Sequence, residues 1–280
     1  MKIGFIDKYL DEWHANNLPT WLRDETDEIE AIYAYETMPS PNEGGIDGKQ
    51  WAKNQNAIYC DTMEEVIEKS DCLIVLAPNF PEEHEALAEK ALKSGKITYV
   101  DKTFAPDVET AKRMIQTAKE HNTPMFTTSA LRYSKEFEGV SKENIATFSM
   151  RGPGPLGMYS IHQIEPIVTF MGSDPEAVMF IGTEDSPAYV VRYPGNRFAT
   201  GAHFDWECPF NVSIKYSDDK PASYITECTD FFPGFVTKLV EFFKNGKCPV
   251  DYDQTLAVIA IREAAIKGKD KPGEWIKTNL

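Results

Sequence analysis

One lysine in this chain stands where a side chain can do proton chemistry. Lys102 follows the apolar run Ile97–Val100, so it comes at the carboxyl end of an expected strand. Open α/β sheets bind their ligands at that edge. A lysine removed from water has a lowered pKa, so Lys102 could polarise a substrate hydroxyl or relay a proton. The alternative is an ordinary surface lysine.

A histidine and a glutamate form a second candidate pair. His162 stands next to the expected helix Gln163–Met171 and could act as a general base. Glu165, three residues on, shares its helix face and could orient the imidazole. The alternative is a histidine packed between domains. A metal pair is less favoured, because the sequence shows no third ligand.

Three further polar residues lie near expected strand ends. His14 belongs to a polar and aromatic cluster after the first strand, which predicts either a new ligand pocket or a helix cap beside core tryptophans. His84 lies early in the expected helix Pro81–Ser94 and can bond a loop carbonyl or contact a ligand. Glu36 ends the second strand, where an acid contacts the ribose hydroxyls in NAD-type sites.

The elements that position these residues alternate in the first half of the chain. The expected strands are 2–6, 29–35, 57–60, 71–76, 97–100 and 125–128. Helical segments separate most of them, and Pro19 is taken as the start of a second helical segment after the first strand. The stretch 37–49 is rich in Pro, Gly and Asn and indicates a loop. This alternation predicts a doubly wound parallel sheet.

The pattern changes after Gly139. The expected strands there are 146–151, 177–182, 188–193, 197–204, 210–216 and 222–228, with turn residues between them. Hairpin-connected strands predict an antiparallel sheet, and later helices are expected at 235–243 and 254–267. We therefore expect an α/β protein with a Rossmann-like domain over residues 1–125. A second α/β domain over residues 126–280 would hold an open, mainly antiparallel sheet, its last helix packing back toward the first domain.

Composition restricts the possible partners. The 280 residues carry a net charge of −15 and the pI is near 4.8. Nucleic acids and anionic membranes need a basic surface, so the sequence favours a small-molecule ligand over either. Five cysteines without a C-x-x-C motif predict reduced thiols in a cytoplasmic protein. No signal peptide and no membrane-length apolar run is expected.

Several motifs occur in an order that resembles the Gfo/Idh/MocA family, the relatives of glucose–fructose oxidoreductase and inositol dehydrogenase. They are Ala77-Pro78-Asn79 with His84, Ala91 to Lys96, Asp101-Lys102-Thr103, Arg132-Tyr133 to Phe137, Ser160 to Glu165 with Gly172, and Tyr252 to Ala265. Asp101-Lys102-Thr103 matches the family's E-K-P, whose lysine lies near the nicotinamide and the substrate. The resemblance covers nearly the whole chain.

The resemblance implies an NAD or NADP cofactor and a sugar, polyol or related hydroxy compound as substrate. It implies Lys102, His162 and Glu165 as catalytic residues. The residues that it places near the cofactor are Asp7, Tyr9, His14, Glu36, Pro78, Asn79, His84, Asp101 and Arg132. Because wide open sheets in such proteins often pair between subunits, a homo-dimer or higher homo-oligomer is expected.

The chain departs from this family at two places. A dinucleotide site needs G-x-G-x-x-G after the first strand, but Asp7 and Tyr9 stand at the first two glycine positions. The negative charge of this loop repels phosphate. Met158 stands where the family has its catalytic acid. Two hypotheses follow: an NAD(P)-dependent oxidoreductase with a degenerate glycine loop, or a non-redox member that binds a small polar ligand.

Overall fold

The chain divides into two compact units. The computed structural model describes residues 1–77 and 79–280. The first unit consists of residues 1–105, 109–127 and 236–251, and the second of residues 106–108, 128–235 and 252–280.

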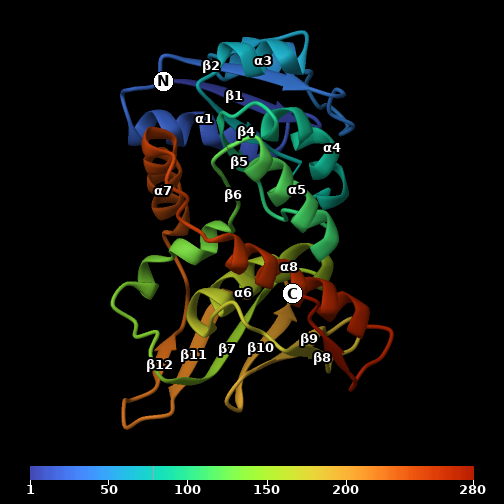
Figure 1. The fold of residues 1–280 in the computed structure, drawn as a ribbon, viewed down its shortest axis with the longest axis vertical. Helices are drawn as coiled ribbons and strands as arrows, with labels where there is room; N and C mark the ends of the chain where they lie inside the picture. The colour runs from blue at the N-terminus through green and yellow to red at the C-terminus, as the bar shows by residue number, and fades with distance from the viewer. Residues whose placement is uncertain (78) are drawn as a thin grey trace. The chain divides into compact units, whose positions relative to one another are not determined.

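The first unit is built on a six-stranded sheet in the order β3-β2-β1-β4-β5-β6 (Figure 1). The strands are β1 (Lys2–Asp7), β2 (Ala31–Glu36), β3 (Ile58–Tyr59), β4 (Cys72–Val75), β5 (Ile97–Val100) and β6 (Met125–Phe126). All neighbours pair in parallel. This strand order is that of the Rossmann fold, whose ligands bind at the carboxyl ends of the strands. The predicted doubly wound sheet is thus confirmed.

Helices connect these strands. They are α1 (Trp13–Glu25), α2 (Gly48–Asn54), α3 (Met63–Lys69), α4 (Pro81–Leu92) and α5 (Val108–Glu120). The expected second helical start at Pro19 is wrong, since Pro19 lies inside the continuous helix α1 and is buried there. The loop expected over 37–49 ends two residues early, because the Asp47 side chain accepts a hydrogen bond from Gln50 N–H and caps α2.

A helix from late in the chain completes the first unit. This helix, α7 (Phe231–Asn245), starts four residues earlier than expected. Its Phe242 ring meets Phe126 of β6 edge to face, with the ring centroids 4.7 Å apart. The thiol of Cys248 donates to the carbonyl of Met125 at 3.2 Å. Residues 236–251 therefore pack on the edge strand of the first sheet.

The second unit is built on a seven-stranded sheet in the order β12-β11-β7-β10-β9-β8-β13 (Figure 1). The strands are β7 (Ile145–Pro153), β8 (Ala177–Phe180), β9 (Ala188–Tyr193), β10 (Arg197–Phe204), β11 (Asn211–Tyr216), β12 (Ser223–Ile225) and β13 (Trp275–Lys277). The pair of β7 and β10 is parallel, whereas the other pairs are antiparallel. The predicted, mainly antiparallel sheet is confirmed.

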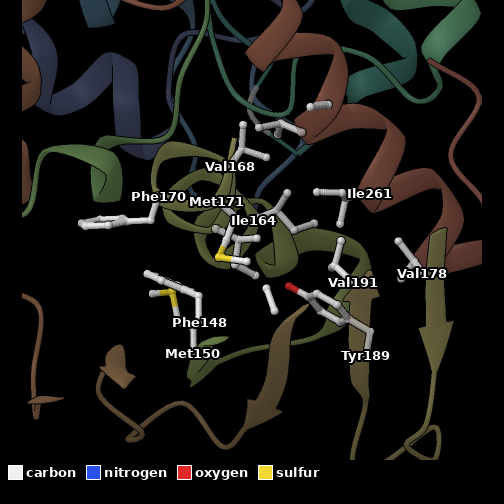
Figure 2. Close-up of a cluster of buried hydrophobic side chains, with 14 of the residues drawn as sticks. Phe148, Met150, Ile164, Val168, Phe170, Met171, Val178, Tyr189, Val191 and Ile261 are labelled. Carbon is white, nitrogen blue, oxygen red and sulfur yellow. The ribbon is translucent and has the colours of Figure 1, made fainter. Parts of the chain in front are cut away.

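Two long helices cover one face of this sheet. They are α6 (Leu156–Met171) and α8 (Tyr252–Gly268), and two short 3-10 helices, η1 (Ala130–Tyr133) and η2 (Lys135–Phe137), precede β7. Figure 2 shows apolar side chains of α6, α8 and the central strands, including Ile164, Phe148 and Val191, meeting in one buried cluster. The opposite face is more open, since Phe198 and Phe204 of β10 are 42% and 51% exposed.

The part of the chain that the structure describes contains no helix with the length and apolarity needed to cross a bilayer.

Candidate functional site

The turn between β1 and α1 is held together by carboxylates. Glu12 is the N-cap of α1, and its side chain accepts hydrogen bonds from the backbone N–H groups of His14 (2.9 Å) and Ala15. These N–H groups belong to the first turn of the helix, which carries the positive end of the helix dipole and binds anions. The chain's own carboxylate therefore occupies this anion site.

Asp7 ends β1 beneath this turn and is 1% exposed. Its Oδ1 accepts a hydrogen bond from Lys8 N–H at 2.6 Å. Burial raises the pKa of Asp7 well above its ordinary value, and the charge of Glu12 raises it further. Burial also raises the pKa of Glu12. The two carboxyl groups therefore resist ionising together.

Tyr9 lies in the same turn and is half-buried. Its ring stands edge-on to Phe80, with the centroids 6.2 Å apart. Burial raises the pKa of its phenol, and the charge of Asp7 adds to this effect. Tyr9 thus presents a neutral hydroxyl beside the turn.

Glu36 bonds the backbone instead of leaving its carboxylate free. Its Oε2 accepts from Leu10 N–H at 2.9 Å, and its Oε1 accepts from Gly48 N–H at 2.6 Å. The first bond ties the end of β2 to the turn after β1, and the second ties it to the start of α2. Both carboxylate oxygens of this strand-end acid serve the protein's own chain.

Asp101, which is buried, and His14, which is partly buried, form a pair at the carboxyl edge of the first sheet. His14 Nδ1 lies 2.8 Å from Asp101 Oδ2, and the Tyr99 hydroxyl donates to Asp101 Oδ1 at 2.9 Å. Burial opposes ionisation of Asp101, but His14, Lys102 and His84 together hold the pKa of this carboxyl below its usual range. His14, from α1, thus meets the residue that follows β5.

Lys102 is buried, with 8% of its surface exposed. Burial lowers the pKa of its ammonium group, while the charges of Asp101 and Glu12 act in the opposite direction. The peptide bond between Lys102 and Thr103 is cis. The sequence alternative of an ordinary surface lysine does not describe this position, because the side chain is held out of water.

His84 has a structural bond. Its Nδ1 lies 2.8 Å from the carbonyl oxygen of Thr103 and therefore donates to it. Burial lowers the pKa of His84, so the ring is held neutral. Of the two alternatives for His84, the bond to a loop carbonyl is the one present. Asn79 is exposed, and Pro78 lies outside the described residues.

His162 is the chemically notable residue of the second unit. It lies in α6, which begins at Leu156, seven residues earlier than expected. The Ser129 hydroxyl lies 2.7 Å from its Nδ1. Ser129 Oγ also accepts from Leu131 N–H at 3.3 Å, and its second lone pair can accept from Nδ1–H. In that tautomer Nε2 carries no proton, as a general base needs.

Glu165 and Arg132 form a buried ion pair in the second unit. Arg132 Nε donates to Glu165 Oε2 at 2.7 Å, and the two side chains are 8% and 4% exposed. Arg132 Nη1 donates to Gln254 Oε1 at 2.6 Å, which links η1, α6 and α8. Ser129, to which the sequence did not point, lies within hydrogen-bond distance of His162 Nδ1. Its only local signal was a serine before a short helical turn.

Residues 14–129 match the family model GFO_IDH_MocA, described as the oxidoreductase family with an NAD-binding Rossmann fold. The resemblance to the Gfo/Idh/MocA family is thereby confirmed. The match begins at His14, after the turn in which the glycine motif would lie.

Several solved structures share the fold of this chain along its length. A probable dehydrogenase from Thermotoga maritima is 15% identical, with a TM-score of 0.80 and 99% of each chain covered. The WlbA dehydrogenase from Bordetella pertussis, in complex with NADH and UDP-GlcNAcA, is 14% identical (TM-score 0.75, 100% of this chain and 98% of that one). Myo-inositol 2-dehydrogenase from Lactobacillus plantarum is 14% identical (TM-score 0.74, 100% and 99%). No curated protein matches the chain.

The residues of this Rossmann-like unit do not fit a dinucleotide in the ordinary Rossmann manner. That manner uses the first N–H groups of α1 for the pyrophosphate and a free acid at the end of β2 for the ribose. Glu12 takes the first set of donors, and Glu36 bonds two backbone amides. Asp7 adds a further acid where phosphate charge would lie. Both anchors are thus satisfied within the chain.

Proposed function

We propose that this chain is a non-redox member of the Gfo/Idh/MocA family that binds a sugar, polyol or related hydroxy compound. The observation that supports this most is that both anchors of a dinucleotide are already in use. Glu12 bonds the α1 amides that would hold the pyrophosphate, and Glu36 bonds two backbone amides instead of staying free for the ribose. Loss of an anion site need not affect sites for uncharged ligands, because hydroxyl groups need only single donors and acceptors.

Proton-handling groups remain in both units. In the first unit we assign to Lys102 the polarisation of a ligand hydroxyl, since it is buried and its pKa is lowered by that burial. In the second unit we assign to His162 the acceptance of a hydroxyl proton, with Ser129 as the residue that fixes its tautomer. The relatives named above are described with an inositol or a sugar nucleotide, which supports a polyhydroxylated ligand.

A second candidate is the NAD(P)-dependent oxidoreductase acting on a CH–OH group. The match of residues 14–129 to an oxidoreductase family favours it, as does the position of Lys102 after β5. This candidate requires the dinucleotide to bind without the α1 amides and without Glu36.

Titration with NADH and NADPH separates the two candidates. We expect no saturable change in nicotinamide fluorescence, and no thermal shift, at millimolar concentrations of either cofactor. The matched variant is Glu12→Gly with Glu36→Gln, which frees the α1 amides, keeps an acceptable N-cap and removes two carboxylates. Binding is expected to rise in this variant. Saturable micromolar binding by the unaltered protein would rule out the non-redox proposal.

For assembly we propose a homo-dimer or higher homo-oligomer formed through the open face of the second sheet. Phe198 and Phe204 of β10 leave apolar surface exposed on that face. Light scattering of the purified protein is expected to give at least twice the chain mass of 31.6 kDa. Replacing both phenylalanines by serine is expected to reduce that mass, and a monomeric unaltered protein would contradict the proposal.

A further inference from the structure

The end of β7 in the second unit is shaped to admit aromatic rings. A Cβ atom at Gly152 would lie 2.2 Å from Cδ1 of Phe210, and one at Gly154 would lie 2.7 Å from Cγ of Tyr159. Cζ3 of Trp206 would be 3.0 Å from the same added atom at Gly154. Gly154 also has a φ of +77°, which favours glycine. Two glycines thus leave room for three rings.

Two of these rings lie beside His162, and the third packs against one of them. The Tyr159 ring lies 4.9 Å from the imidazole at 66°, and the Phe210 ring lies 5.9 Å from it at 62°. Trp206 stands perpendicular to Tyr159, at 89° and 4.8 Å between centroids. The imidazole, which is hydrogen-bonded to Ser129 through Nδ1, is therefore a polar group with two aromatic rings beside it.

The exposure of Trp206 shows that it is not a core residue. It is 60% exposed, whereas a tryptophan that serves packing is mostly buried. An exposed aromatic side chain next to a polar group of catalytic type is characteristic of ligand sites, which combine apolar walls with a few polar groups that orient the ligand. Tyr159 and His162, both half-buried, provide the neighbouring surface.

We propose that the exposed ring of Trp206 forms a platform for the ring of a cyclic sugar or cyclitol, with the perpendicular Tyr159 ring as a side wall, and that this platform makes the His162 site selective for cyclic over open-chain hydroxy compounds. This inference rests on the proposed function. One face of such a ring carries C–H bonds and packs against an aromatic face, while its edge carries hydroxyl groups. Those hydroxyls can reach donors and acceptors such as the His162 and Ser129 pair. An open-chain polyol has the same hydroxyls but no preformed apolar face.

The test compares cyclic and open-chain ligands by isothermal titration calorimetry. The probes are the methyl pyranosides of glucose, galactose and mannose, myo-inositol, and the alditols glucitol, galactitol and mannitol. We expect at least one cyclic probe to bind more tightly than every alditol. In Trp206→Ala its affinity is expected to fall about tenfold, with alditol binding unchanged. Trp206→Phe should restore most of the loss, and Tyr224→Ala, which alters another exposed aromatic residue, should have no effect.

The outcomes distinguish this inference from the function on which it rests. If alditols bind as well as the cyclic probes, or if Trp206→Ala weakens both classes equally, the platform is wrong and the proposed function stands. If no probe binds the unaltered protein, both fall. Because Trp206 is largely exposed, thermal unfolding of Trp206→Ala should match that of the unaltered protein, so a loss of binding is not a loss of folding.

Discussion

Replacing Glu165 by leucine is expected to destabilise the second unit by about 3–5 kcal/mol, because it leaves the buried Arg132 guanidinium without its carboxylate partner. The two charges lie 2.7 Å apart with almost no solvent contact. The midpoint of thermal unfolding should fall by roughly 2–4 °C for each kcal/mol in a unit of this size. Urea unfolding followed by circular dichroism gives the change in free energy.

Two controls make this expectation sharp. Glu176→Leu breaks a pair with the same Nε to Oε2 contact, at 3.0 Å between Arg192 and Glu176, but both of these side chains are 46% exposed. It should cost less than about 1 kcal/mol, since solvent screens exposed pairs. The double variant Arg132→Met with Glu165→Leu removes both charges and should recover most of the lost stability. Equal losses of unfolding free energy in Glu165→Leu and Glu176→Leu would show that burial does not increase the cost of breaking the Arg132 pair.

Asp7→Asn is expected to stabilise the protein at neutral pH. Burial, and then the charge of Glu12, raise the pKa of Asp7 in the folded state, whereas an unfolded aspartate ionises near about pH 3.9. The folded state therefore binds this proton more tightly. Stability from Asp7 is present below the unfolded pKa and is lost as the pH rises through the folded pKa. Asparagine has nearly the same shape, can still accept from Lys8 N–H, and carries no charge.

The difference between Asp7→Asn and the unaltered protein should thus depend on pH. Below about pH 4 the two proteins should unfold at the same temperature, and the advantage of the variant should grow toward neutral pH. Each unit of pKa difference corresponds to about 1.4 kcal/mol. Asp185→Asn, at an exposed position, serves as the control and should show no such trend. A less stable Asp7→Asn at pH 7 would mean that the ionised carboxylate has a favourable partner.

The architecture was largely predictable because periodicity and strand order follow from simple rules. The alternation of strand and helix up to Phe126 predicted the parallel sheet, and the run of strands after Gly139 predicted the second one. Helix starts were harder. The helix expected from Gln163 begins at Leu156, so α6 contains Gly157, whose type disfavours helices, as well as Pro166. Packing on the sheet of the second unit outweighs these local penalties.

The candidate site was only partly predictable. Lys102 and Asp101 follow from their place after β5. The use of Glu12 does not, because glutamate is not among the preferred N-cap types, and only the structure shows its carboxylate on the α1 amides. The pairing of Ser129 with His162 joins residues 33 positions apart. Such contacts depend on side-chain directions that no local pattern specifies.

The placement of α7 affects how the chain folds while it is being synthesised. Residues 236–251 belong to the first unit, but they follow almost all of the second unit's sheet in the sequence. While the chain is being synthesised, Phe126 on edge strand β6 lacks its partner Phe242 until the strands β7 to β12 have emerged. Domains usually fold as units in order of synthesis. Here the first unit is complete only after residues 236–251 have been synthesised. A chain that ended shortly after β6 would therefore expose the apolar edge of the first sheet at Phe126.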